Sequence, residues 1–171
     1  MKSKASESAH MKIEVYFESK HGNGKKVVEK LAEDLTAKGH AVGLHHIGEV
    51  RPKEMPSADL YLFSSPTRMG KPVGSMRRFV KKVKVPTQGA KYALIATHGA
   101  AKPNKKTGVI PSPAELEKWR RTIPMMEEIL NRKGMMKVAD LQVYVLDLKG
   151  PLEDGWEDKV GVFAELVLSK L

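Results

Sequence analysis

The chain has no cysteine among its 171 residues. Disulfides, thiolate metal sites and thiol catalysis are therefore excluded. No continuous apolar stretch approaches the roughly 18 residues that a membrane-spanning helix needs, and the first residues lack the apolar core of a signal peptide. From these absences we expect a cytoplasmic protein.

Aromatic side chains are also scarce, at 6% of the residues. The formal net charge is nevertheless +10, with an isoelectric point near 9.7, and the basic residues are spread along the chain without a long run. Because stacking aromatics are few, a dedicated nucleic-acid surface is not expected. The charge instead points to an acidic partner or another polyanion, or simply keeps the protein in solution.

Length and composition fit one globular domain, with 41% hydrophobic and 29% charged residues. Residues 1–10 are rich in Ser, Ala and Lys and have no periodicity, so we interpret them as a tag or disordered leader. Residues 11–171 are expected to form a single domain.

Apolar runs alternate with helical patterns along the chain. This alternation predicts an α/β three-layer sandwich with a five-stranded parallel sheet. The expected strands are 12–17, 41–47, 60–63, 92–97 and 138–148. The expected helices are 25–38, a segment carrying Met76, Phe79, Val80 and Val83, a segment between 112 and 134, and a final helix carrying Trp156, Val160, Phe163 and Val167.

Two helix starts carry capping signals. Ser112, Pro113 and Glu115 predict a capping box with proline at the first helical position, and Asp154 with Glu157 predicts a second capping pair. After Ser112, apolar residues that include Leu116 and Trp119 recur at helical intervals, which predicts one buried stripe. Pro124 interrupts that stripe, so we expect a kink or two short helices.

The segment from Glu18 to Lys26 joins the first strand to the first helix through two glycines. Backbone N–H groups in the first turn of a helix have no intrahelical partner, and the helix dipole is positive there, so such a turn can bind an anion. Lysines at this position are unfavourable unless an anion is present. The predicted phosphate-binding residues are Ser19, Lys20, His21, Gly22, Asn23 and Gly24.

Two further loops follow the third and fourth predicted strands, at 64–74 and 97–108. In sheets of this type, ligands bind outside the carboxyl ends of the strands, at the point where the strand order reverses. If the strand order is 2-1-3-4-5, both loops come together with the loop at 18–25. The residues expected to line the site are Ser65, Pro66, Thr67, Arg68, Met69, Gly70, Thr97, His98 and Gly99.

Two of these loops resemble those of the flavodoxin family. Ser19-x-His21-Gly22-Asn23-Gly24 is similar to the family's Ser/Thr-x-Thr-Gly-Asn-Thr phosphate loop, and residues 64–72 are similar to its Ser-Pro-Thr-aromatic-x-Gly-x-Pro loop. Thr97-His98-Gly99 stands where the third flavin loop begins. The resemblance implies a flavodoxin-like fold, with the strand order 2-1-3-4-5 in its parallel sheet. It also implies FMN as cofactor and electron transfer as activity, either as a carrier or as an FMN-dependent oxidoreductase. An acidic redox partner protein or a small quinone-like acceptor would then be the partner.

The chain departs from the family pattern at several positions. The two family threonines of the phosphate loop are replaced by His21 and Gly24, and no Trp or Tyr occurs in 64–74 or 97–108. Met69 and His98 are the nearest substitutes for a stacking aromatic. Positive neighbours such as Arg68 would stabilise an anionic reduced flavin, which predicts a higher potential than that of an acidic carrier.

Other interpretations remain open at this stage. A flavodoxin-like binding or regulatory module that lacks FMN could use the phosphate loop or the basic surface for another ligand. A hydrolase using Ser64 or Ser65 with His98 lacks the Gly-x-Ser-x-Gly elbow, and we nominate no catalytic side chain. His45 and His46 are adjacent in a strand and point to opposite faces, so we expect surface histidines and no metal site.

Overall fold

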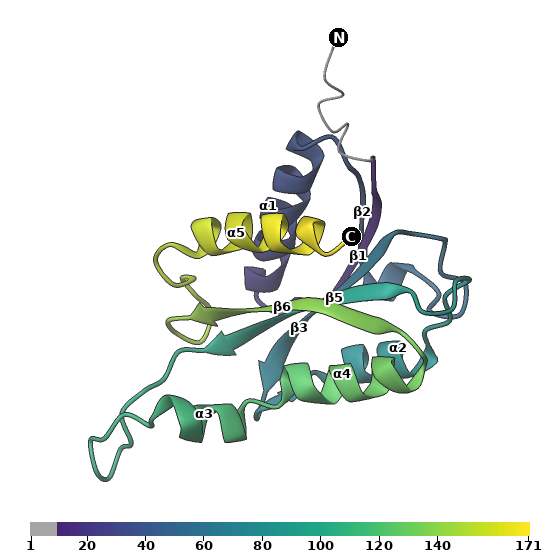
Figure 1. Ribbon diagram of the computed structural model, residues 1–171. Helices are drawn as coiled ribbons and strands as arrows, with labels where there is room; N and C mark the ends of the chain where they lie inside the picture. The colour runs from purple at the N-terminus through teal and green to yellow at the C-terminus, as the bar shows by residue number, and fades with distance from the viewer. Residues whose placement is uncertain (1–9) are drawn as a thin grey trace.

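The computed structural model describes residues 10–171, and Figure 1 shows its strands and helices. The prediction of a tag or leader at 1–10 falls almost entirely outside the described residues. None of the helices in the described part is both long and apolar enough to cross a membrane. The elements are β1 (Lys12–Phe17), α1 (Asn23–Ala37), β2 (Ala41–His46), the 3₁₀ helix η1 (Ile47–Glu49), β3 (Leu60–Arg68), β4 (Lys71–Pro72), α2 (Gly74–Lys82), β5 (Lys91–Gly99), α3 (Pro113–Trp119), α4 (Thr122–Arg132), β6 (Met136–Val145) and α5 (Trp156–Ser169).

The five long strands form a parallel sheet of order β2-β1-β3-β5-β6. This order confirms the predicted flavodoxin-like fold. The short strand β4 was not predicted, because the whole segment 64–74 was interpreted as a loop. It pairs antiparallel with the end of β3 through a tight turn at Met69 and Gly70, which both have positive φ angles, 50° and 77°. Two residues of this conformation form the type of turn that matches the twist of a hairpin.

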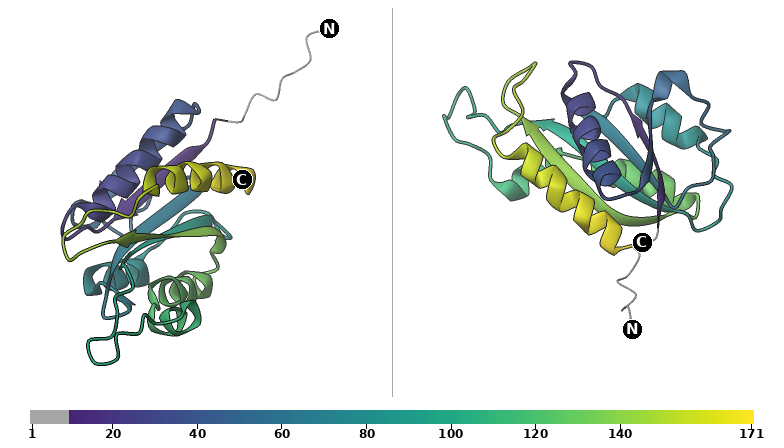
Figure 2. Two further views of the ribbon diagram at one scale, coloured as in Figure 1. Left: turned by 90° about the vertical axis from the view of Figure 1, so that its left-hand side faces the viewer. Right: turned by 90° about the horizontal axis from the view of Figure 1, so that it is seen from above.

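Helices cover both faces of the sheet, as Figure 2 shows. α1 and α5 pack on one face and α2 and α4 on the other, over two separate clusters of buried side chains. β3 and β5 lie in the middle of the sheet and are buried on both faces, which explains why their sequences are almost continuously apolar. The carboxyl ends of β1, β3 and β5 therefore meet at one edge of the molecule.

The segment between β5 and β6 contains two short helices, as Pro124 predicted. The predicted capping box of α3 is present, with Ser112 and Glu115 bonded to each other's backbone N–H groups. The predicted burial of Trp119 is wrong, since 61% of this residue is exposed and α3 has no buried residue. The chain leaves the helical conformation at Arg120, where ψ is 91°, so the buried stripe of α4 does not continue into α3.

The predicted capping pair of the last helix is also wrong. The residue that caps α5 is Gly155, at φ 76°, and no side chain caps this terminus. Glu157 instead lies in the first turn, where a carboxylate interacts favourably with the helix dipole. The predicted core residues Val160, Phe163 and Val167 are buried, whereas Trp156 is only half-buried.

Candidate functional site

The turn from β1 to α1 is a helix N-terminus without a side-chain cap. Gly22 stands at the cap position with φ 87°, a left-handed conformation that favours glycine, and the first turn has no acidic residue. The Ser19 hydroxyl oxygen accepts a hydrogen bond from the N–H of Lys25 at 3.2 Å. The Ser19 side chain therefore lies against the first turn of the helix, at the position that the sequence predicted.

The backbone N–H groups of residues 20–24 form a row of free donors. Across residues 10–171, none of them donates a hydrogen bond to another group of the protein, and the regular helical bonding of α1 begins only at Lys26, whose N–H binds the Gly22 carbonyl oxygen at 3.1 Å. Free donors at the positive end of a helix dipole favour a bound anion. The exposed side chain of Lys20 adds to this positive field, and the His21 ring lies exposed beside it.

The position of Gly24 explains one departure from the family pattern. A Cβ atom at this residue would lie 3.3 Å from the Glu18 carbonyl oxygen and 3.6 Å from the Ser19 Cβ. The loop is therefore too tight for a threonine unless the backbone shifts. Asn23 is 8% exposed, and a Cβ atom at Gly150 in the β6–α5 loop would lie 3.2 Å from its side-chain oxygen, so this loop passes close to the anion-binding turn.

A cavity of about 360 Å³ opens next to this turn, at the carboxyl ends of the strands. It brings together most of the residues that the sequence predicted, and it lies beside a second hollow of about 540 Å³ that shares Thr67, His98 and Gly99 with it. Their size and mixed lining are typical of ligand pockets. The predicted residues at the first cavity are Ser19, Lys20, His21, Asn23, Gly24, Pro66, Thr67, Arg68, Thr97, His98 and Gly99, and those at the second hollow alone are Met69 and Gly70.

Gly22 and Ser65 do not line either space. Gly22 shapes the turn through its backbone conformation. Ser65 is fully buried, and its hydroxyl donates to the Pro66 carbonyl oxygen at 2.8 Å and accepts from the Val73 N–H at 3.3 Å. Ser65 therefore holds the β3–β4 segment in shape.

The second hollow contains an aromatic residue that the sequence interpretation missed. Trp119 lines it together with Met69, because the N–H of Arg121 binds the Gly70 carbonyl oxygen at 2.6 Å and so fixes the end of α3 against the hairpin. Trp119 lies outside 64–74 and 97–108, the two loops in which a stacking aromatic was expected. Trp119 is exposed because the helix ends at Arg120. The apolar spacing of the sequence continues across this break and therefore gave no sign of it.

A second aromatic residue, Tyr144 near the end of β6, lines neither space but packs behind His98. Its ring centroid lies 6.2 Å from that of His98, and the guanidinium group of Arg120 lies 4.7 Å from the Tyr144 ring centroid. Because Arg120 also donates to the Gly99 carbonyl oxygen at 2.8 Å, it connects β5 and β6 at the site.

His98 is 2% exposed and lines both spaces. Burial, followed by the nearby charge of Arg120, lowers the pKa of His98 to about 4, against the effect of a hydrogen bond with Gln142. The ring is therefore neutral at pH 7, and its Nδ1 atom has no hydrogen-bond partner among residues 10–171. Neither Ser64 nor Ser65 is bonded to it, so the geometry of a serine hydrolase is not present.

The two adjacent histidines of β2 lie on opposite faces of the sheet, as predicted, but they are half-buried and paired. His45 Nε2 lies 2.6 Å from a Glu14 carboxylate oxygen, and His46 Nε2 lies 2.8 Å from Glu18. Burial raises the pKa of Glu18, but hydrogen bonds from Ser75, His46 and the Ser19 N–H outweigh burial, and the pKa is lower than usual. Glu18 thus ties β2 and α2 to the start of the anion-binding turn.

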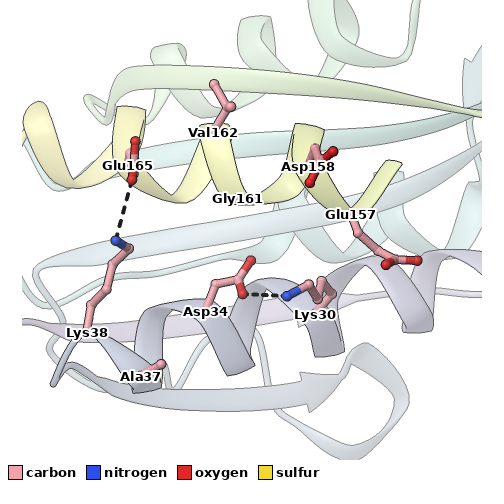
Figure 3. Close-up of a pocket in the computed structure, with 9 residues that line it drawn as sticks. All are labelled: Lys30, Asp34, Ala37, Lys38, Glu157, Asp158, Gly161, Val162 and Glu165. Atoms are coloured by element: carbon pink, nitrogen blue, oxygen red, sulfur yellow. Dashed lines mark hydrogen bonds and ion pairs between the residues drawn. The ribbon is translucent and has the colours of Figure 1, made fainter. Parts of the chain in front are cut away.

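A further hollow, of about 690 Å³, lies between α1 and α5, away from the strand ends (Figure 3). Its lining is charged, but lysines neutralise part of its acidic groups: Lys30 lies 2.7 Å from Asp34, and Lys38 lies 3.6 Å from Glu165. Nothing in this hollow resembles a cofactor or catalytic site.

Solved structures share this fold at low sequence identity. The flavodoxin of Streptococcus pneumoniae TIGR4 is 15% identical, with a TM-score of 0.70 over 94% of this chain and 99% of that one. The Fusobacterium nucleatum flavodoxin bound to flavin mononucleotide is 10% identical, with a TM-score of 0.66 and the same coverage. The rubredoxin oxygen:oxidoreductase of Desulfovibrio gigas is 13% identical, with a TM-score of 0.67 over 92% of this chain and 35% of that one.

A search of curated protein sequences finds no match. The sequence pattern of the family described as flavodoxin domain, by contrast, matches residues 14–144. This match spans β1 to β6 and contains the anion-binding turn and both neighbouring loops. The chain therefore belongs to the flavodoxin family.

Proposed function

We propose that this chain binds FMN at the carboxyl ends of β1, β3 and β5 and transfers electrons through it. One observation carries the proposal: the free N–H groups of residues 20–24 stand at an uncapped helix N-terminus, beside a cavity that the two other loops line. Anions bind at such termini. Family membership supports this choice of cofactor, as does the flavin mononucleotide bound to the Fusobacterium nucleatum relative.

The phosphate group would be held by the backbone N–H groups of 20–24, with side-chain donors from Ser19 and His21. The Ser19 hydroxyl oxygen already accepts from Lys25, which leaves its O–H proton free to donate. Lys20 supplies a positive charge at the mouth of the turn. The first turn of α1 has no acidic residue, so no carboxylate of this turn competes with the phosphate for these donors.

The ring system would lie between the β3–β4 hairpin and the end of β5, with Met69 and Trp119 as its apolar neighbours. FMN, when bound, supplies the redox chemistry, and the protein sets its position and potential. Arg68 and Lys20 favour the more negative, reduced state, so we expect a potential above that of an acidic carrier. The partner would be an acidic redox protein or a small quinone-like acceptor.

The test is a titration of the purified protein with FMN, and in parallel with riboflavin, followed by flavin fluorescence and visible absorption. We expect saturable quenching by FMN and much weaker binding of riboflavin, because riboflavin lacks the phosphate. Absence of FMN binding at tens of micromolar would refute the proposal and favour the alternative, a module of this family that lacks the flavin.

A pair of charge reversals separates the phosphate site from the overall charge. Lys20 and Lys38 are both exposed lysines, but only Lys20 lies at the cavity. We expect Lys20→Glu to weaken FMN binding about tenfold, as a charge reversal near an anion does in partial solvent, and to leave riboflavin binding unchanged. Lys38→Glu should change neither. Equal losses in both variants would mean that only the net charge matters.

A further inference from the structure

Exposed apolar side chains gather at the edge of the molecule where the parallel strands end. Nine large hydrophobic residues are exposed within residues 10–171, and six of them lie at this edge. The six are Met69, Val109, Ile110, Trp119, Leu146 and Leu148. Clustering of this kind marks a surface that contacts something other than water.

The projecting segment 100–121, here called the arm, contributes three of the six. It runs from the end of β5 through α3, and none of its residues is buried. Figure 1 shows how far its loop extends from the sheet. Val109 is 63% exposed and Ile110 59%, and neither lines the cavity or the second hollow, so a ligand bound there would not cover them.

The tip of the arm has a defined shape. The Asn104 N–H binds the Val109 carbonyl oxygen at 2.9 Å, and the Asn104 side-chain oxygen accepts from the N–H groups of Lys106 and Thr107 at 2.8 and 3.2 Å. These bonds close the turn and hold Val109 and Ile110 outward. A fixed turn presents these aliphatic side chains at little further cost in conformational entropy.

Basic side chains flank these apolar tips. Residues 60–114 contain eleven lysines and arginines and no aspartate or glutamate. Five of the eleven lie in the β3–β4 hairpin and the arm: Arg68, Lys71, Lys102, Lys105 and Lys106. The acidic residues of the arm are Glu115 and Glu117, in α3, away from its tip. Of the three lysines near the tip, only Lys102 forms an ion pair within the described residues, with Asp147 at 3.4 Å.

Each of three neighbouring loops combines an apolar tip with a basic residue. Met69 lies in the turn between Arg68 and Lys71, Leu148 precedes Lys149, and the arm places its lysines just before Val109. The loops are linked at their bases, since the Ala100 N–H binds the Val145 carbonyl oxygen at 2.8 Å and the end of the arm binds Gly70. In the right-hand view of Figure 2 the arm and the β6–α5 loop project from the same end.

We propose that this edge of the molecule binds the surface of an anionic lipid bilayer. A rigid protein partner would need a surface complementary in shape to these separate projecting loops. A fluid bilayer has no such requirement, so it fits the separate tips better. Aliphatic tips enter the boundary between headgroups and acyl chains, while flanking lysines remain at the level of the anionic headgroups. The inference does not depend on FMN, because its residues at the arm tip lie outside the proposed cofactor site.

The experiment is co-sedimentation of the full chain with vesicles of equal parts phosphatidylglycerol and phosphatidylcholine. Vesicles of phosphatidylcholine alone are the lipid control. We expect binding to the anionic vesicles that weakens with added salt, and no binding to the neutral ones. Lys105→Gln/Lys106→Gln should lower the partition coefficient about 25-fold, since each lysine near an anionic surface contributes roughly fivefold. Val109→Ser/Ile110→Ser should lower it about tenfold.

A matched control uses exposed apolar residues elsewhere. Val162 and Leu166 lie on α5, outside this edge, and Val162→Ser/Leu166→Ser should leave binding unchanged. Trp119 gives a second readout in the Trp156→Phe background, where its emission should shift to the blue on anionic vesicles. Absence of binding to these vesicles, or equal losses in the arm and α5 variants, would overturn the proposal. Binding that Val109→Ser/Ile110→Ser leaves unchanged would also overturn the proposal and would point to an acidic protein partner. Because the assay runs without flavin, its result is independent of the FMN titration.

Discussion

Replacing Gly70 by alanine tests how the arm is held against the β3–β4 hairpin. A Cβ atom at Gly70 would lie 2.1 Å from the carbonyl oxygen of Trp119, and no side-chain rotation can relieve a contact with backbone. Gly70 also has a φ angle of +77°, which is unfavourable for alanine. The substitution must therefore strain the turn and push the end of α3 away.

The magnitude follows from these two effects. The left-handed conformation costs alanine about 1–2 kcal/mol. The arm has no buried residue, so it can move aside without opening the core. Relieving the clash then breaks only the hydrogen bond between Arg121 N–H and the Gly70 carbonyl oxygen, and this loss costs about 1 kcal/mol. We expect Gly70→Ala to lower the free energy of unfolding by about 2–3 kcal/mol.

Gly89→Ala is the matched control. Gly89 has a φ angle of +73°, but nothing lies within 4 Å of a Cβ atom there. This variant should lose the conformational term alone, so the two variants should differ by about 1 kcal/mol. Urea unfolding measures the difference, which corresponds to a midpoint shift of about 0.5 M for a protein of this size.

Fluorescence supplies the local readout. In the Trp156→Phe background Trp119 is the only tryptophan that emits, because the chain has two tryptophans. Gly70→Ala should increase the quenching of Trp119 by acrylamide, and Gly89→Ala should not. Equal unfolding midpoints together with unchanged quenching would refute the contact between the hairpin and the arm, and with it the location of Trp119 beside the candidate flavin site.

Two further predictions concern pH. The Glu18 carboxyl has a lowered pKa in the folded state, so its ionised form stabilises the fold above the usual pKa of glutamate. This contribution is lost as pH falls through the folded-state pKa. Glu18→Gln should therefore reduce the loss of unfolding free energy at acid pH, measured by urea unfolding. His98, whose pKa is lowered from 6.5 to about 4, remains neutral in the folded chain while the unfolded chain takes up a proton; stability should therefore fall by up to about 3 kcal/mol between pH 6.5 and 4, and His98→Gln should remove that slope.

The controls for these predictions are simple. Glu165 is exposed and only loosely paired with Lys38, so Glu165→Gln should leave the acid end of the curve unchanged. An acid limb that is the same in Glu18→Gln as in the unaltered chain would contradict the role assigned to its hydrogen bonds. A slope between pH 6.5 and 4 that persists in His98→Gln would mean that another group takes up the proton.

Much of the candidate site could be anticipated because it depends on local sequence. The glycines of 22–24 and the neighbouring lysines indicate an anion-binding turn wherever a strand precedes them and a helix follows. The order of strands and helices then brings the loops after β3 and β5 to the same edge. Thr67, Arg68, Thr97 and His98 reach the cavity for this reason.

The residues that were missed depend on contacts between distant segments. Trp119 has the spacing of a core residue, and only the break at Arg120 and the hydrogen bond to Gly70 turn it toward the second hollow. Tyr144 lies beside His98 because β6 pairs with β5 in a register that sets the two residues opposite each other. The same limitation applies to Glu18, whose bonds to Ser75 and His46 join residues far apart in the chain.

Hydrophobic periodicity and glycine positions act over a few residues, and they suffice to predict the alternation of strands and helices and the anion-binding turn. Tertiary contacts settle which side chains are buried without a partner, which aromatic residue borders the second hollow, and where exposed apolar residues meet positive charge. These properties depend on the relative position of elements that lie up to about a hundred residues apart, and a sum over local preferences does not contain that information.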